Sequence, residues 1–142
     1  MAQGSNLVLV DTSVWVDFLT GAESAQRHEL HRLIDGGKPV ILTGLIVMEI
    51  LQGIRRDKHF DAVRTQLSLY PIVEPSMATY FQAASLYRKC RKQGITVRSP
   101  IDCLISVIAV ESGATLLHKD RDFTAISRVF PLKLHSFAQT KN

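Results

Sequence analysis

The sequence predicts an α/β domain with a mainly parallel central sheet. Short apolar runs rich in Val, Ile and Leu recur along the chain, and longer segments with helical periodicity fill the gaps between them. The runs are apolar nearly throughout rather than at alternate positions, which is typical of strands that helices cover on both faces. We therefore expect a three-layer α/β/α arrangement around a sheet of about five strands.

Strands and helices are expected in a fixed order along the chain. They are a strand at residues 7–10, a helix containing Trp15 and Phe18, a helix at 23–34, a strand at 40–42, helices at 45–54 and 60–67, a strand at 69–73, helices at 77–92 and 103–111, a strand at 115–117, a short helix at 123–129 and a strand at 132–134. Trp15 is expected in the core, since aromatic side chains contribute much of the buried apolar surface of protein interiors.

Glycines and capping residues mark several helix ends. Gly36 and Gly37 stop the helix at 23–34, and Gly113 closes the helix at 103–111. Thr43 can cap the helix at 45–54.

Length and composition indicate one folded domain spanning residues 1–142, with a polar lead-in at 1–6 and a tail at 138–142. Hydrophobic residues make up 46% and charged residues 21%, which excludes disordered and fibrous classes. The formal charge of +4 permits a polyanionic partner without requiring one. Cys90 and Cys103 lack the spacing of a metal or redox motif and are expected to be reduced. No run approaches the roughly 18 apolar residues of a membrane span, so we expect a cytoplasmic protein.

Acidic residues follow the apolar runs where parallel strands would end. Asp11 follows the first run, and Asp120 and Asp122 follow the run at 115–117. Ligands bind beyond the carboxyl ends of such strands. Each acid also has a local explanation, because an Asp between a strand and a helix often caps that helix.

Asp102 and Glu49 extend the set. Ser99, Pro100 and Asp102 together resemble a capping box with Pro at the first helical position, so Asp102 taken alone is ambiguous. Glu49 lies within the apolar segment "GLIVMEILQGI", where a charge needs a partner. Either Glu49 emerges at the edge of the helix, or it pairs with a basic side chain such as Arg55 or His118, or it binds a cation.

If these acids converge, their mutual repulsion requires protons or cations. Carboxylates without Cys, and with His scattered, select a hard ion such as Mg²⁺ or Mn²⁺. On the same preference His118 is expected to line the edge of the site rather than bind the metal.

Three segments, "VDTSVWVDFL", "LIVMEILQGIR" and "SPIDCLISVIAVESGATLLHKDRDF", resemble the successive signatures of a PIN-domain ribonuclease, more narrowly the VapC toxin of a toxin–antitoxin pair. The resemblance spans residues 7–134. It implies a PIN-like fold and assigns metal-binding and catalytic roles to Asp11, Glu49, Asp102 and Asp120, with Asp122, Ser13 and Thr12 in support. Ser13 and Thr12 match the hydroxyl position that orients the first Asp or a metal-bound water.

The resemblance further implies Mg²⁺- or Mn²⁺-dependent endonucleolytic cleavage of RNA by a metal-activated water, a homodimer, and inhibition by a VapB-type antitoxin. Arg55, Arg56 and Lys58 lie just beyond the Glu49 helix and are candidates for RNA contact. A solvated helix end is an equally good explanation for them.

Other readings fit less well. A haloacid-dehalogenase-like phosphatase needs an Asp where Ser13 stands, and a receiver domain does not explain Glu49. The remaining alternative is a non-catalytic PIN-like module that binds RNA or protein, for which loss of one or more acids is expected; all are present.

Overall fold

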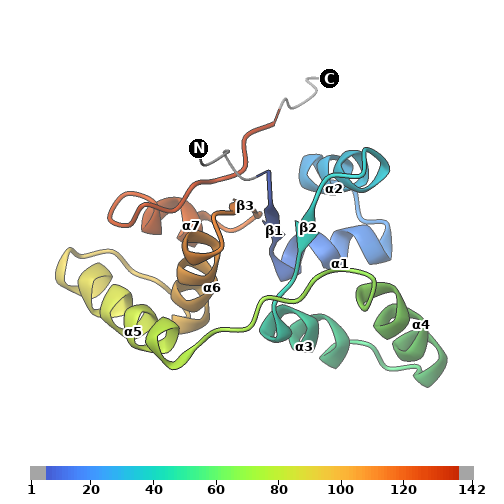
Figure 1. Ribbon diagram of the computed structural model, residues 1–142, viewed down its shortest axis with the longest axis horizontal. Helices are drawn as coiled ribbons and strands as arrows, with labels where there is room; N and C mark the ends of the chain where they lie inside the picture. Colours follow the sequence, from blue (N-terminus) through green and yellow to red (C-terminus); the bar gives the residue numbers. More distant parts are fainter. Residues whose placement is uncertain (1–5, 138–142) are drawn as a thin grey trace.

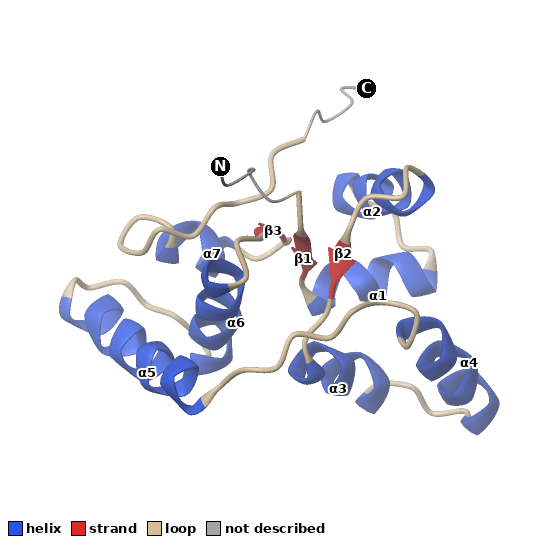
Figure 2. Cartoon of the chain, viewed as in Figure 1, coloured by secondary structure: helices blue, strands red, loops and turns tan. Residues whose placement is uncertain are grey.

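A computed structural model describes residues 6–137, which surround a short parallel sheet (Figures 1 and 2). The strands are β1 (Val8–Val10), β2 (Val40–Ile41) and β3 (Thr115–Leu117), in the order β2-β1-β3. Val8 lies opposite both Val40 and Thr115 in register. The predicted lead-in, apart from Asn6, and the predicted tail lie outside the described residues.

The helices are α1 (Thr12–Thr20), α2 (Ala25–Asp35), α3 (Gly44–Gln52), α4 (Asp57–Leu67), α5 (Met77–Lys92), α6 (Pro100–Glu111) and α7 (Arg121–Ile126). Figure 1 shows α1 to α4 gathered on one side of the strands and α5, α6 and α7 on the other. The predicted layered α/β fold with a parallel sheet is confirmed.

The prediction of about five strands was wrong, because two segments pair at a single residue each. Ile72 bridges Leu42 and Leu134 bridges Leu116, both in the parallel sense. They therefore extend the sheet beyond β2 and β3 without forming full strands.

Local backbone bonding explains why these two segments stay short. In residues 69–73 the first two amides bond back to α4, from Leu69 to Gln66 and from Tyr70 to Leu67, and Pro71 has no N–H to donate. In the last segment the amide of Leu132 bonds back to Phe130. Each segment therefore begins as a turn.

The ends of the helices differ from the predicted ends by a few residues. Helix α6 begins at Pro100 rather than at residue 103, because Ser99 caps it and Pro fits its first position. Helix α7 ends at Ile126 rather than at residue 129. Thr43 caps α3, as expected.

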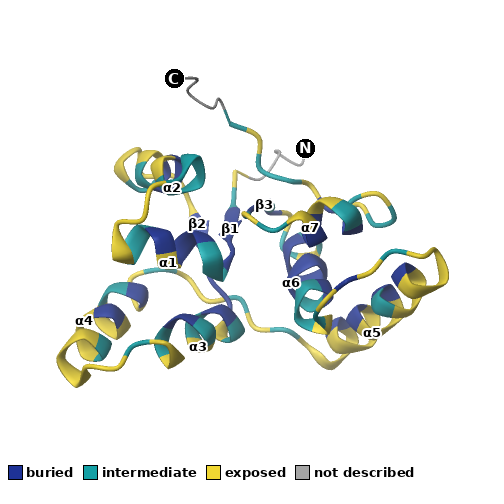
Figure 3. Ribbon diagram, turned by 180° about the vertical axis from the view of Figure 1, so that it is seen from behind, coloured by how far each residue is buried: buried dark blue, intermediate teal, exposed yellow. Residues whose placement is uncertain are grey.

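The described residues share one hydrophobic core in which the strands and the inner helix faces are buried (Figure 3). Trp15 is fully buried, as predicted. Cys90 and Cys103 are buried free thiols, and burial raises the pKa of Cys103 to about 12. Within residues 6–137, no helix combines the length and apolar character needed to cross a bilayer.

Candidate active site

Asp11 stands at the junction of β1 and α1. Its backbone occupies the N-cap position, but its carboxylate makes no capping hydrogen bond. Ser13 Oγ donates instead to Asp11 Oδ2 at 3.0 Å. Burial raises the pKa of Asp11, with a smaller contribution from the charge of Glu49. Asp11 therefore holds the N-cap position without a capping hydrogen bond, and the nearby amides of Thr12 and Ser13 only partly offset the effect of burial on its pKa.

Glu49 lies on α3 and faces the start of α1. Thr12 Oγ1 donates to Glu49 Oε1 at 2.7 Å, and within residues 6–137 no basic side chain forms an ion pair with Glu49. The suggested pairing of Glu49 with Arg55 or His118 is therefore wrong. His118 instead accepts a hydrogen bond from the Asp120 amide through Nδ1 and packs against Phe123.

Asp102 lies in the first turn of α6 and takes no part in capping that helix. Ser99 accepts its capping bond from the Ile101 amide, and Asp102 contributes no return bond, so no capping box forms. Burial raises the pKa of Asp102 to about 7, and the charges of the other four candidate acids add to the effect. Because only nearby charges act in this way, Asp102 lies near all four of these acids.

Asp120 and Asp122 lie at the start of α7. Asp120 Oδ1 caps the helix by accepting from the Asp122 amide at 2.9 Å. Arg98 binds both acids, from Nη2 to Asp120 Oδ1 at 2.7 Å and from Nε to Asp122 Oδ2 at 3.1 Å. The Arg98 amide also donates to Asp122 Oδ2 at 3.1 Å.

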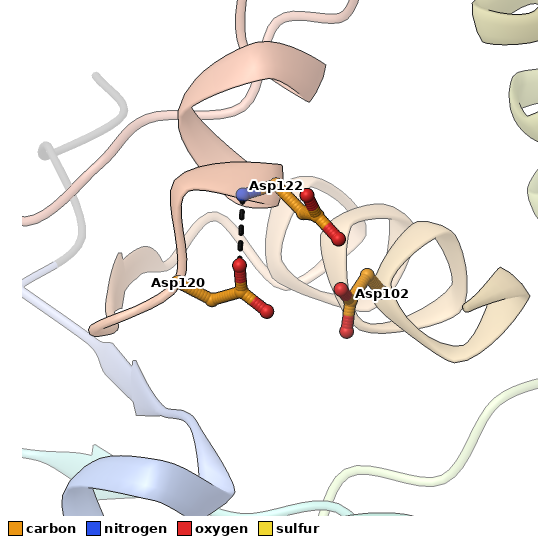
Figure 4. A group of neighbouring side chains, drawn as sticks. All are labelled: Asp102, Asp120 and Asp122. Atoms are coloured by element: carbon orange, nitrogen blue, oxygen red, sulfur yellow. Dashed lines mark hydrogen bonds between the residues drawn. The ribbon is translucent and has the colours of Figure 1, made fainter. Parts of the chain in front are cut away.

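Asp102, Asp120 and Asp122 form the tightest acidic group (Figure 4). Each offers one carboxylate oxygen, and these oxygens all lie within 4.8 Å of one another. Asp11 and Glu49 lie near enough for their charges to act on Asp102 but outside this triad. The structure thus brings the predicted acids to one region and gives Asp122, expected only in support, a central place.

The donor chemistry fits a hard divalent cation. The triad offers carboxylate oxygens alone, which suits Mg²⁺ or Mn²⁺ better than zinc. Two of its three members, Asp102 and Asp120, were expected to bind metal.

A cleft of about 480 Å³ opens beside the acids. It is lined by Asp11, Ser13, Arg98, Lys119, Asp120 and Arg121. The three basic residues were not among the predicted site residues, although "VRSPID" and "HKDRDF" place them directly beside the acids in sequence.

A second cavity, of about 400 Å³, touches the other side of the site through Glu49. Its walls are mainly apolar, with Val16, Leu19 and Ile50 among them, and Arg55 and Arg56 line it as well. Lys58 is exposed nearby on α4. Two of the three predicted RNA-contact residues therefore lie in a cavity that reaches a candidate metal ligand.

The family model of the PIN domain matches residues 8–129, so the chain belongs to the PIN-domain family. The family assignment can be narrowed by sequence. The chain is 35% identical over 133 residues to ribonuclease VapC11 of Mycobacterium tuberculosis (strain ATCC 25618 / H37Rv), covering 92% of this chain and 99% of that relative. Within the PIN-domain family, the chain thus belongs with the VapC ribonucleases.

Solved structures share the fold at lower identity. VapBC2 from Rickettsia felis, solved bound to a DNA fragment from its promoter, matches with a TM-score of 0.73 and 17% identity over 93% of this chain and 99% of that chain. VapC20 of Mycobacterium tuberculosis, described as a sarcin-ricin loop cleaving toxin, matches with a TM-score of 0.66 and 18% identity over 83% and 93%.

Proposed function

We propose that this protein is a divalent-metal-dependent endoribonuclease and the toxin of a VapBC-type pair. The observation that carries the proposal is the convergence of Asp102, Asp120 and Asp122, with Asp11 and Glu49 beside them, in a chain of the VapC ribonuclease class. Carboxylates gathered this closely repel one another unless positive charges offset them. Arg98 offsets part of this charge at Asp120 and Asp122, and a divalent cation would offset the rest.

The acids and hydroxyl groups of the site would have different roles in metal binding and cleavage. Asp102, Asp120 and Asp122 would hold the ion, with Asp11 and Glu49 completing the acidic group. When bound, Mg²⁺ or Mn²⁺ supplies a water of lowered pKa and neutralises charge that develops on the phosphate. Ser13 orients Asp11, and Thr12 orients Glu49, through their hydroxyl groups.

RNA would approach across the basic residues around these acids. Arg55 and Arg56 line the cavity that contains Glu49, and Lys58 follows on the same exposed segment. Their charges suit phosphate contact, which gives affinity without reading sequence. They would guide RNA past the acids toward the cleft.

Two protein partners are part of the proposal. Solved structures that share the fold include a toxin–antitoxin complex from Klebsiella pneumoniae. We propose a VapB-type antitoxin for this chain, with the apolar cavity beside Glu49 as its docking place. For a homodimer, Met77, Tyr80 and Phe81 offer an exposed apolar face at helical spacing on α5. Buried free thiols suit action in the reducing cytoplasm.

The decisive experiment is cleavage of total RNA by antitoxin-free protein in Mg²⁺, Mn²⁺ or EDTA, beside an Asp11→Asn variant whose folding circular dichroism confirms. We expect discrete cuts that need metal and disappear in the variant. Cleavage that survives in the folded variant would point to a contaminating nuclease or another site. A metal-binding wild type that cuts no RNA in any condition would favour the binding-module alternative.

A further inference from the structure

Arg98 is the one basic residue within residues 6–137 that forms ion pairs with the candidate metal ligands. It lies in the loop before α6 and reaches the start of α7, 22 and 24 residues away. Its side chain is 70% exposed, so burial does not force it onto these acids. Electrostatic attraction and the fork of donors of a guanidinium account for the contact.

We propose that Arg98 serves as the internal counter-ion of Asp120 and Asp122 and thereby lowers the affinity of the site for a divalent cation. The inference rests on the proposed metal-dependent function. It adds a residue that sets how tightly the acids bind the metal.

The hydrogen bonds leave room for a metal beside the arginine. Arg98 binds Oδ1 of Asp120 and Oδ2 of Asp122, so the second oxygen of each carboxylate is outside the ion pair. Asp102, the third member of the triad, does not bond to Arg98. An incoming cation can therefore use these oxygens, but it meets the positive charge of the guanidinium nearby, and a fixed charge of the same sign lowers its affinity.

The two acids are also held by hydrogen bonds that do not use the Arg98 side chain. The Arg98 amide donates to Asp122 Oδ2, and the Asp122 amide donates to Asp120 Oδ1. A substitution at Arg98 thus removes charge while it keeps the backbone bonds that aim the carboxylates. This separates an electrostatic role from a scaffolding role.

The test is a calorimetric titration of RNA-free, antitoxin-free full-length protein with Mn²⁺, comparing the wild type with Arg98→Gln, Arg98→Lys and Arg121→Gln. Arg98→Gln should bind Mn²⁺ about tenfold more tightly, an estimate for removing one charge from beside a divalent ion in a partly solvated cleft. Arg98→Lys keeps the charge and should stay near the wild type. Arg121 lines the same cleft but forms no ion pair with the acids in the described part of the chain, so Arg121→Gln is the matched control and should change the affinity less.

Thermal unfolding supplies a second readout. In EDTA, Arg98→Gln should melt at a lower temperature than the wild type because the acids lose their counter-ion, and added Mn²⁺ should close the gap. Equal or weaker Mn²⁺ binding by folded Arg98→Gln would overturn the inference, as would equal tightening by Arg121→Gln. A wild type that binds no Mn²⁺ would refute the metal-dependent function itself, which distinguishes the two failures.

Discussion

The hydroxyl of Thr12 lies 2.7 Å from Oε1 of Glu49 and donates a hydrogen bond to it. This bond joins the first turn of α1 to α3 across 37 positions of sequence. The next residue, Ser13, donates to Asp11. Two consecutive hydroxyl groups therefore orient two acids that come from different elements.

Replacing Thr12 by Val should impair the enzyme without unfolding it, because Val keeps the shape and removes only the donor. Losing a hydrogen bond to a charged group costs about 1.5–3 kcal/mol, so we expect kcat/KM for a cleaved reporter RNA to fall about ten- to a hundredfold. Thr12→Ser should retain most activity.

Thr65→Val is the matched control for this substitution. Thr65 is exposed on α4 and its hydroxyl bonds only to the Asp61 carbonyl oxygen, so its loss should leave cleavage unchanged. Equal activity of Thr12→Val and the wild type would show that Glu49 needs no orienting donor.

The metal-free protein should lose stability from Asp102 as the pH rises. Burial and the neighbouring acids raise the pKa of Asp102 in the folded protein to about 7, above the value of about 3.9 in an unfolded chain. The folded state therefore binds this proton more tightly, and the stabilisation that protonation gives is complete below about pH 4 and disappears toward pH 7.

Urea unfolding in EDTA at several pH values measures this effect as the difference between the wild type and Asp102→Asn. The variant should gain stability over the wild type as the pH rises from 4 to 8, and it should fail to bind Mn²⁺. Parallel curves for the two proteins would mean that Asp102 is not held under repulsion. Comparing the pair cancels the contributions of titrating groups that lie away from this acidic cluster.

Much of this architecture could be predicted because short stretches of sequence determine it. Apolar runs and helical periodicity identified the layers, and Thr43 marked a helix start correctly. The sheet was overestimated because residues 69–73 have strand composition, yet two of their amides complete the turn after α4. Composition alone does not show to which carbonyl oxygen a backbone amide will donate its hydrogen bond.

The sequence points to the acids of the candidate site but not to its basic residues. Only Glu49 stands out locally, because its apolar segment offers a charge no evident partner. Asp11 and Asp102 each have a capping explanation, and the expected convergence of the acids and the family resemblance singled them out. Arg98 does not stand out, since an exposed arginine in a loop is ordinary in sequence. Its role depends on a contact across 22 residues with Asp120, which only the folded chain reveals.

Glu29 is a further long-range contact, and it should anchor the C-terminal segment. It is 4% exposed on α2, and it accepts hydrogen bonds from Arg32 and from His135, 106 residues away. Replacing it with Gln breaks a largely buried ion pair, so Glu29→Gln should lower the free energy of unfolding by about 2 kcal/mol in urea at pH 7.

Glu23→Gln provides the comparison, because Glu23 is an exposed acid paired with Arg27 and His28 near the same helix, and exposed pairs contribute little. The hydrogen bonds from Arg32, and then from His135, lower the pKa of Glu29 although burial opposes them. Its contribution is therefore present above the pKa of an unfolded Glu and is lost as the pH falls through the folded value. The gap between Glu29→Gln and the wild type should close in acid, and a gap independent of pH would show that packing, rather than charge, holds the C-terminal segment in place.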